Sequence, residues 1–412
     1  MIRCSFIIAA VAAAMLSAAD PIATLTARTG AVYVILEDDA GKERSRSEAR
    51  PGAVFNGGEK LATAKGAKAS LSFIDGTVVD VAENSELMIT PTDEWSDKNK
   101  NTIALLFGYL VAKVQKITGD DSVKFQVTTP SAIASVRGTV FGVGVGDDGS
   151  SLIGVEEGVV DVLGDVGGKN TVSLAQNEGV ETGLAGGPMQ KKREFMLKNF
   201  EYGKWNDQLK EAFAKNPEMA MKAIDKRFET AMKMMVLNEE GTKQVLKKMH
   251  EVAQAREHAE RANNRELVRK LSESEEKLFD ALFMQKMQEK ALTGAFISYR
   301  GIYMKIFEGA KGSPEMMQKI GPAMRSMREI DMKVHERKQE MKRIVEGDRD
   351  FMQARMKANN IDPMRVRGRM EQKMREAQEK GAVDRERLER ERRERMEREK
   401  DAPKPPDRKP PR

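Results

Sequence analysis

Residues 125–141 read FQVTTPSAIASVRGTVF, and this stretch decides the first half of the fold. Val, Ile and Thr are residues that favour strands, and they recur on both sides of Thr129–Pro130. Proline cannot donate to a strand ladder, so this dipeptide is expected to end one strand and set the entry to the next. Gly138 is expected to let the backbone bend. The stretch therefore predicts strands at Val123–Thr128 and Val140–Val145.

The same short bursts of β-branched residues, separated by Gly, Asp and Asn, extend over residues 24–187. Asp75–Gly76 is a dipeptide of the kind that supplies positive φ in a hairpin turn. Regularly spaced strands without helices between them predict an all-β module over residues 20–187, either a sandwich or a short β-solenoid. Further strands are expected at Ala31–Leu36, Ala69–Ile74, Thr77–Val81, Ile103–Val114, Ser151–Val155 and Val159–Leu163.

Several blocks in this region resemble the FecR domain, a β-rich extracytoplasmic module of signalling regulators. The resemblance covers about residues 28–165, and it rests on the order and spacing of turns and alternating strands rather than on any one motif. The blocks that carry it are Gly58–Thr63, Ala69–Phe73 with Asp75–Thr77, Ser85–Ile89, Gly108–Leu110, Thr129–Pro130 with Val136–Thr139, and Val155–Val160.

The resemblance implies a module that binds a ligand or a protein partner. Its candidate binding or signature residues are Thr129, Pro130, Arg137, Gly138 and Thr139. Arg137 could contact a ligand, but the favoured reading is a structural ion pair with a nearby carboxylate such as Asp161 or Glu157. Signalling members of the family also carry a cytoplasmic helical segment and one membrane span. This chain shows neither pattern, so iron and sigma-factor signalling are not expected to transfer with the module.

Residues 1–19 have the pattern of a signal peptide. A positive start at Arg3 is followed by the uncharged run Phe6–Leu16 and by the small residues Ser17–Ala19 before a cleavage point at Asp20. The run is too short to span a bilayer, and no other stretch is long and apolar enough. We therefore expect an exported protein, periplasmic or secreted, without a transmembrane span after cleavage.

Residues 188–383 are rich in Met and charged side chains, and they predict an all-α, partly coiled-coil region. Helix starts are expected at the Pro residues of Asn216–Glu218, Ser313–Glu315 and Asp362–Pro363. Breaks are expected at Glu240–Gly241, Gly309–Ser313 and Asn359–Pro363, which leaves four to six helices. Residues 384–400, nearly pure Arg and Glu, predict a charged solvated helix, and the Pro-rich basic residues 401–412 a disordered tail.

The net charge of +6 hides two unlike halves. Residues 20–189 hold 15 Lys and Arg against 24 Asp and Glu, a net charge of −9, whereas residues 190–412 hold 54 against 40, a net charge of +14. Opposite charges of this size could bring the two halves together within one chain or between chains. Because acids interrupt the Arg residues and the chain is expected to be exported, no nucleic-acid partner is expected.

Residue types that carry common catalytic chemistry are scarce. One Cys and three His make a metal site or a Cys nucleophile improbable, and no catalytic residue, metal or cofactor is predicted. Methionine sulfur can bind Cu(I), but the adjacent pairs Met234–Met235 and Met316–Met317 point in diverging directions on a helix. Gly144–Gly149 formally satisfies a dinucleotide-binding pattern, but a strand follows it and Asp147–Asp148 would repel phosphate, so a hairpin turn is expected.

The sequence therefore predicts a non-enzymatic binding protein of the cell envelope. In the first hypothesis the FecR-like module binds a ligand or partner, while the helices mediate oligomerisation or bind a partner protein. Two alternatives remain open: a structural envelope protein whose helices are the active part, and an accessory component of FecR-type transmembrane signalling.

Overall fold

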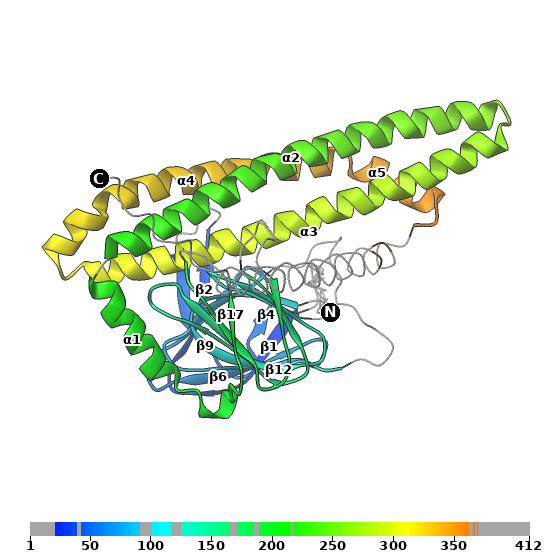
Figure 1. Ribbon diagram of the computed structural model, residues 1–412. Helices are drawn as coiled ribbons and strands as arrows, with labels where there is room; N and C mark the ends of the chain where they lie inside the picture. Colours follow the sequence, from blue (N-terminus) through cyan, green and yellow to red (C-terminus); the bar gives the residue numbers. More distant parts are fainter. Residues whose placement is uncertain are drawn as a thin grey trace, which may run out of the picture.

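The computed structural model describes residues 21–38, 43–90, 101–116, 125–164, 171–184, 189–215 and 217–361, together with Val366 and Arg369. The predicted signal peptide, the charged helix at 384–400 and the tail at 401–412 lie outside the described residues, as does the helix start at Asp362–Pro363. The described strands form a β module, and the helices that follow pack against it (Figure 1).

The β module contains two sheets that share strand β9, Asn101–Lys113. Sheet A has the strand order β4-β1-β6-β7-β9-β12-β13-β16-β17, and all of its pairings are antiparallel. Its other strands are β1 (Ala23–Thr29), β4 (Val54–Phe55), β6 (Lys68–Phe73), β7 (Val78–Val81), β12 (Val140–Val145), β13 (Ser151–Glu157), β16 (Gly179–Thr182) and β17 (Gln190–Lys192). Strand β17 lies beyond the predicted end of the module at residue 187.

Sheet B has the order β3-β2-β5-β8-β9-β10-β11-β14-β15, and only its β9–β10 pair is parallel. Its other strands are β2 (Val32–Glu37), β3 (Glu43–Glu48), β5 (Lys60–Thr63), β8 (Glu86–Ile89), β10 (Phe125–Thr128), β11 (Ile133–Val136), β14 (Val160–Leu163) and β15 (Thr171–Leu174). Strand β3 was not predicted, because every residue of its sequence ERSRSE is exposed and no apolar alternation marks it.

Strand β9 passes from one sheet to the other at Gly108. Residues before this glycine pair with β8 and β10, whereas Gly108 and the residues after it pair with β7 and β12. Gly108 has φ +101°, and a Cβ there would lie 2.4 Å from the Cα of Ser85. Any larger residue would clash, so the close crossing of the two sheets requires glycine at this position.

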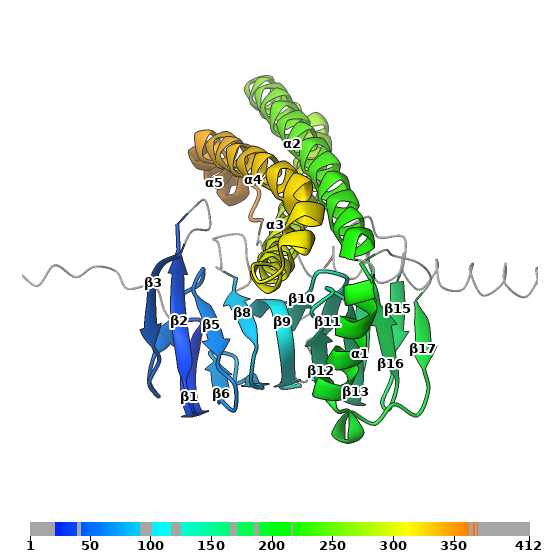
Figure 2. The ribbon, with the colours of Figure 1, turned by 90° about the vertical axis from the view of Figure 1, so that its left-hand side faces the viewer.

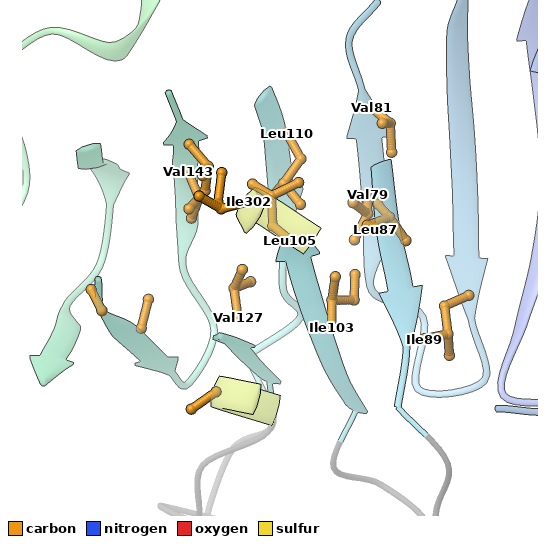
Figure 3. Packing of buried hydrophobic residues seen from close by; sticks show 14 of the residues in the cluster. Val79, Val81, Leu87, Ile89, Ile103, Leu105, Leu110, Val127, Val143 and Ile302 are labelled. Carbon is orange, nitrogen blue, oxygen red and sulfur yellow. The ribbon is translucent and has the colours of Figure 1, made fainter. Parts of the chain in front are cut away.

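Both sheets contribute to one hydrophobic core, so the module is a sandwich. Figure 3 shows part of this core, with Val79 and Val143 from sheet A, Leu87 and Val127 from sheet B, and Ile302 from a helix. The second half of the module is also wound like a short solenoid. Its hairpins β10–β11, β12–β13, β14–β15 and β16–β17 alternate between sheets B and A. The third hairpin joins the first through β11–β14, and the fourth joins the second through β13–β16.

Five α-helices follow in the described residues: α1 (Tyr202–Lys215), α2 (Pro217–Arg261), α3 (Arg265–Ala310), α4 (Pro314–Gly347) and α5 (Arg349–Ala358). A short 3₁₀ turn, Leu197–Asn199, precedes them. We call α2–α5 the arm. Figure 1 shows the α2–α3 hairpin of the arm extending well past the strands, and Figure 2 shows α3 as the arm helix nearest to them. The predicted β module followed by an all-α region is confirmed.

The predicted helix starts at Pro217 and Pro314 and the break at Gly309–Ser313 are confirmed. The predicted break at Glu240–Gly241 is wrong, because α2 runs through it without interruption. Gly241 is kept in the helix by packing: a Cβ there would lie 2.6 Å from Nε2 of Gln285 on α3, so glycine permits a close approach. This contact outweighs a helix propensity cost of about 1 kcal/mol. None of the described helices is both long and apolar enough to cross a membrane.

Candidate functional site

The Thr129–Pro130 turn joins β10 to β11 and is buried. The Thr129 hydroxyl donates to the Ala132 carbonyl at 2.8 Å, and the Ala132 amide lies 2.8 Å from the same hydroxyl oxygen. The predicted role of this dipeptide, ending one strand and setting the entry to the next, agrees with the turn that the structure shows.

A network of buried hydroxyl groups extends from this turn across to sheet A. Ser151 of β13 donates to the Thr129 hydroxyl at 2.8 Å. The Ser131 hydroxyl lies 2.6 Å from that of Ser151 and 3.0 Å from the carbonyl oxygen of Thr182, at the end of β16. Because buried hydroxyl groups are costly without partners, this network holds the end of β16 in one position relative to the signature turn.

The chain segment just after Thr182 receives an arginine from the arm. The Arg227 side chain of α2 donates to the carbonyl oxygens of Leu184 at 2.6 Å, Gly183 at 3.0 Å and Gly164 at 3.4 Å. Guanidinium is suited to this role because its planar fork presents five donors. The signature turn and α2 thus bind neighbouring carbonyl oxygens of residues 182–184, at the end of β16 and just after it.

Helix α3 packs against the outer face of β9. Successive residues of a strand point to opposite faces, so Ile103 and Leu105 face the sandwich core while Ala104 and Leu106 face outward. All four are fully buried, because α3 covers the outer pair. A Cβ on Gly301 of α3 would lie 2.5 Å from the Leu106 side chain. The apolar run in β9 reflects burial on both faces of the strand.

Charged contacts link the acidic module to the basic helical region. Asp147, in the β12–β13 turn, lies 3.2 Å from Nζ of Lys305 on α3 and 3.6 Å from Nζ of Lys210 on α1. The ammonium of Lys305 also stands 3.7 Å from the ring centroid of Phe107. The two halves of opposite charge therefore dock within one chain, which is one of the two arrangements that the charge split suggested.

The outer face of sheet A is covered by aromatic side chains. Gly142 and Gly144 of β12 leave room for Leu197, Tyr109, Tyr202 and Trp205, which pack over the bare backbone. Burial, helped by the charge of Glu156, raises the pKa of Tyr109 to about 12. The formal dinucleotide pattern at Gly144–Gly149 forms the β12–β13 hairpin turn, as predicted, with the Gly146 amide donating to the Ser150 carbonyl.

Arg137, Gly138 and Thr139 lie at the opposite end of β11 from Thr129 and Pro130, so the five predicted residues do not form one site. Arg137 Nη2 lies 3.9 Å from Asp161 Oδ2, in line with the favoured structural reading. Gly138 has φ +66° and the buried Thr139 hydroxyl donates to the Val159 carbonyl at 3.0 Å. Any ligand contact by these residues remains a prediction. The described residues contain no group of three or more His, Cys, Asp or Glu that could hold a metal ion.

Comparison with known families identifies the module. Residues 59–161 match the family model of the FecR protein. The chain contains a FecR domain. The match runs from just before β5 into β14 and includes all five predicted signature residues. FecR proteins are associated with transmembrane signalling, and the match is consistent with an extracytoplasmic location of this domain. No curated protein matches the chain.

The partners of the FecR signature turn were not found from the sequence. Ser131, Ser151, Thr182 and Arg227 were all missed, although Ser131 directly follows Thr129–Pro130 and its position was a usable signal. The others come from distant segments, and Ser and Thr in strands are common enough that no local pattern separates them.

Proposed function

We propose that this chain is an exported, non-enzymatic interaction protein of the cell envelope. In this proposal the FecR domain is a rigid platform, and the arm presents a surface to a protein partner or to a second copy of the chain. The hydroxyl groups of Thr129, Ser131 and Thr139 donate to main-chain carbonyl oxygens inside the domain, which supports a scaffolding role for it.

The observation that carries this proposal is the division of the arm into an anchored part and a projecting part. Near the module, α2, α3 and α4 contribute side chains to the same hydrophobic core as the strands. Farther out, the helices have a separate core around Met249, Phe279 and Met352, away from any strand. A long helical bundle fixed at one end to a β-sandwich is suited to reaching a partner at a distance from the platform.

Site-specific photocrosslinking in the producing bacterium tests where a partner binds. A photoreactive residue replaces Leu237, which is 70% exposed on α2, and in a second variant it replaces Ile74, which is 60% exposed on the module. We expect protein adducts from position 237 and none from position 74, since the two sites are similarly exposed but lie on different parts. Adducts from position 74 alone would contradict the proposal.

The full chain is needed for this test, because the platform and the arm share a core and neither has been shown to fold alone. Cell fractionation of the same variants tests export independently. Recovery of the protein in the cytoplasmic fraction would contradict the proposed location, whatever the crosslinking result.

A second candidate function is an accessory role in transmembrane signalling, which the FecR match favours. In that case the adduct from position 237 should be a membrane-spanning protein. A soluble envelope protein or a second copy of the chain in the adduct would favour the first proposal instead.

A further inference from the structure

The core of the arm is interrupted by polar side chains halfway along its length. On α2, the apolar core next to the module includes Met235, and the outer core begins with Val245 and Leu246. Between them, Asn238, Glu239 and Thr242 are all at least nine-tenths buried. These residues occur at the helical spacing of the core positions before and after them, so polar groups stand where apolar side chains would be expected.

The two neighbouring helices contribute polar groups to the same region. Arg337 of α4 donates to Glu239 at 2.6 Å, and Lys286 of α3 lies 2.8 Å from Glu289 with both side chains largely buried. Gln285 of α3 lies against Gly241. We call this set the polar layer: Asn238, Glu239, Thr242, Gln285, Lys286, Glu289 and Arg337.

Two amide oxygens in the polar layer are buried and have no hydrogen-bond partner among the described residues. They are Oδ1 of Asn238 and Oε1 of Gln285. A buried polar atom without a partner opposes folding, because it has lost its hydrogen bonds to water and has gained none in the protein. The layer therefore contributes less to the closed bundle than an apolar layer of the same size would, and it separates two cores that are each continuous.

The outer core has its own means of cohesion. Glu275 of α3, 1% exposed, accepts hydrogen bonds from Arg256 of α2 at 2.8 Å and from Arg355 of α5 at 2.8 Å. Asn359, at the end of α5, donates to the same carboxylate at 2.7 Å. These bonds tie three helices together beyond the polar layer, so the outer bundle has interhelical contacts of its own.

We propose that the polar layer is a built-in break in the arm, at which the outer bundle opens and closes as a unit while the inner bundle stays on the FecR domain. The outer bundle consists of α2 from Val245, α3 up to Phe283, and α4–α5 from Met341. Local opening takes place where few apolar contacts are lost, and the layer is such a boundary. This inference concerns the chain's own motion and does not depend on the proposed function.

Hydrogen exchange measured by mass spectrometry on the full chain tests this inference. We expect amides of the outer bundle to share one opening equilibrium, with protection at least about tenfold lower than amides of α2 and α3 next to the module. Equal protection along the whole of α2 and α3 would overturn the inference without the need for any variant.

A variant with apolar side chains in the polar layer distinguishes two explanations of low protection. One is a break at the layer, and the other is a gradual fall in protection toward the free end of the arm. The double variant Asn238→Leu with Gln285→Leu removes both unpartnered oxygens, and it should raise protection of the outer bundle about tenfold or more toward that of the inner bundle. The matched control is Gln254→Leu, an exposed position on outer α2 that should leave protection unchanged. If the double variant keeps its helical circular dichroism but leaves outer-bundle protection at the wild-type level, the inference is wrong.

Discussion

Arg227 on α2 donates its Nε–H to the main-chain carbonyl oxygen of Leu184, 2.6 Å away, and so connects the arm directly to the segment that follows β16. The same guanidinium reaches Gly183 and Gly164. The carbonyl oxygens that bind it follow Thr182, which the FecR signature turn positions through Ser131. A turn in the sandwich is thereby connected to the first long helix through residues 182–184.

Replacing Arg227 with lysine should weaken this attachment. A lysine keeps the charge but cannot present the planar fork that reaches three carbonyl oxygens. We expect the free energy of unfolding to fall by about 1.5–3 kcal/mol, the range for hydrogen bonds to charged groups. Urea denaturation followed by circular dichroism measures the change. Lys226→Ala, at the exposed neighbouring position, serves as control and should change stability by less than about 0.5 kcal/mol.

The close packing of α3 on β9 predicts opposite effects for two glycine substitutions in one helix. Gly301→Ala places a methyl group 2.5 Å from Leu106 and should destabilise the protein by about 1–3 kcal/mol. At Gly309 an added Cβ would have no neighbouring atom within 4 Å, so Gly309→Ala should be neutral or stabilising by up to about 1 kcal/mol. Thermal unfolding of both variants measures the difference. Equal effects would show that α3 does not approach the sheet as described.

The hydroxyl network predicts that removing a single hydroxyl group destabilises the fold. Ser131→Ala leaves the Ser151 and Thr182 hydroxyl groups with one partner fewer inside the sandwich. We expect the free energy of unfolding of Ser131→Ala to be about 1–3 kcal/mol lower than that of the wild type. Ser135→Ala, on β11 but only partly buried, is the matched control and should cost less than about 1 kcal/mol. Denaturant titration of the two variants side by side decides whether the network stabilises the fold.

Removing the Glu275 carboxylate at the centre of the outer bundle should destabilise the protein more than Ser131→Ala does. Glu275→Ala leaves Arg256 and Arg355 buried without their shared partner, which should cost about 3–5 kcal/mol in the outer bundle. Glu273→Ala removes an exposed carboxylate two residues away, which pairs with the exposed Arg269, and should cost about 0.5 kcal/mol or less. Limited proteolysis should cleave α5 in the first variant and spare it in the second.

Acid should weaken the polar layer through Glu239. Burial raises the pKa of this carboxyl, but hydrogen bonds from Lys243 and Arg337 outweigh burial and hold the pKa below its usual value of 4.5. A pKa that is lower in the folded state stabilises the fold above the unfolded value, and this stabilisation is lost as the pH falls through the folded value.

The expected result is a drop in the stability of the arm when the pH is lowered from about 6 to about 3, and a smaller drop in Glu239→Gln, which has no proton to gain. Denaturant midpoints at the two pH values measure it. Glu240→Gln, at the exposed adjacent position, should behave like the wild type. An equal acid effect in wild type and Glu239→Gln would exclude a contribution from this carboxylate.

Patterns between near neighbours in the sequence predicted much of the fold. Bursts of alternating residues located eight of the seventeen described strands, Asp75–Gly76 marked the β6–β7 hairpin, and Pro217 and Pro314 marked two helix starts. These features depend on backbone conformation and on which face a side chain occupies, and both are properties of a few consecutive residues. The motifs of the FecR domain could be recognised for the same reason.

The packing of the arm on the domain and the partners of the signature turn could not be predicted in this way. Three hydrogen-bonded pairs join residues that are far apart in the sequence: Arg227 with Leu184, Ser131 with Thr182, and Glu275 with Arg355. The residues around each member do not indicate which residue is its partner. At Gly241 a local pattern gave a wrong prediction, because tertiary packing decided the structure there. Its sequence suggested a helix break, but contact with Gln285 keeps it inside α2, because packing between elements outweighs a local preference of about 1 kcal/mol.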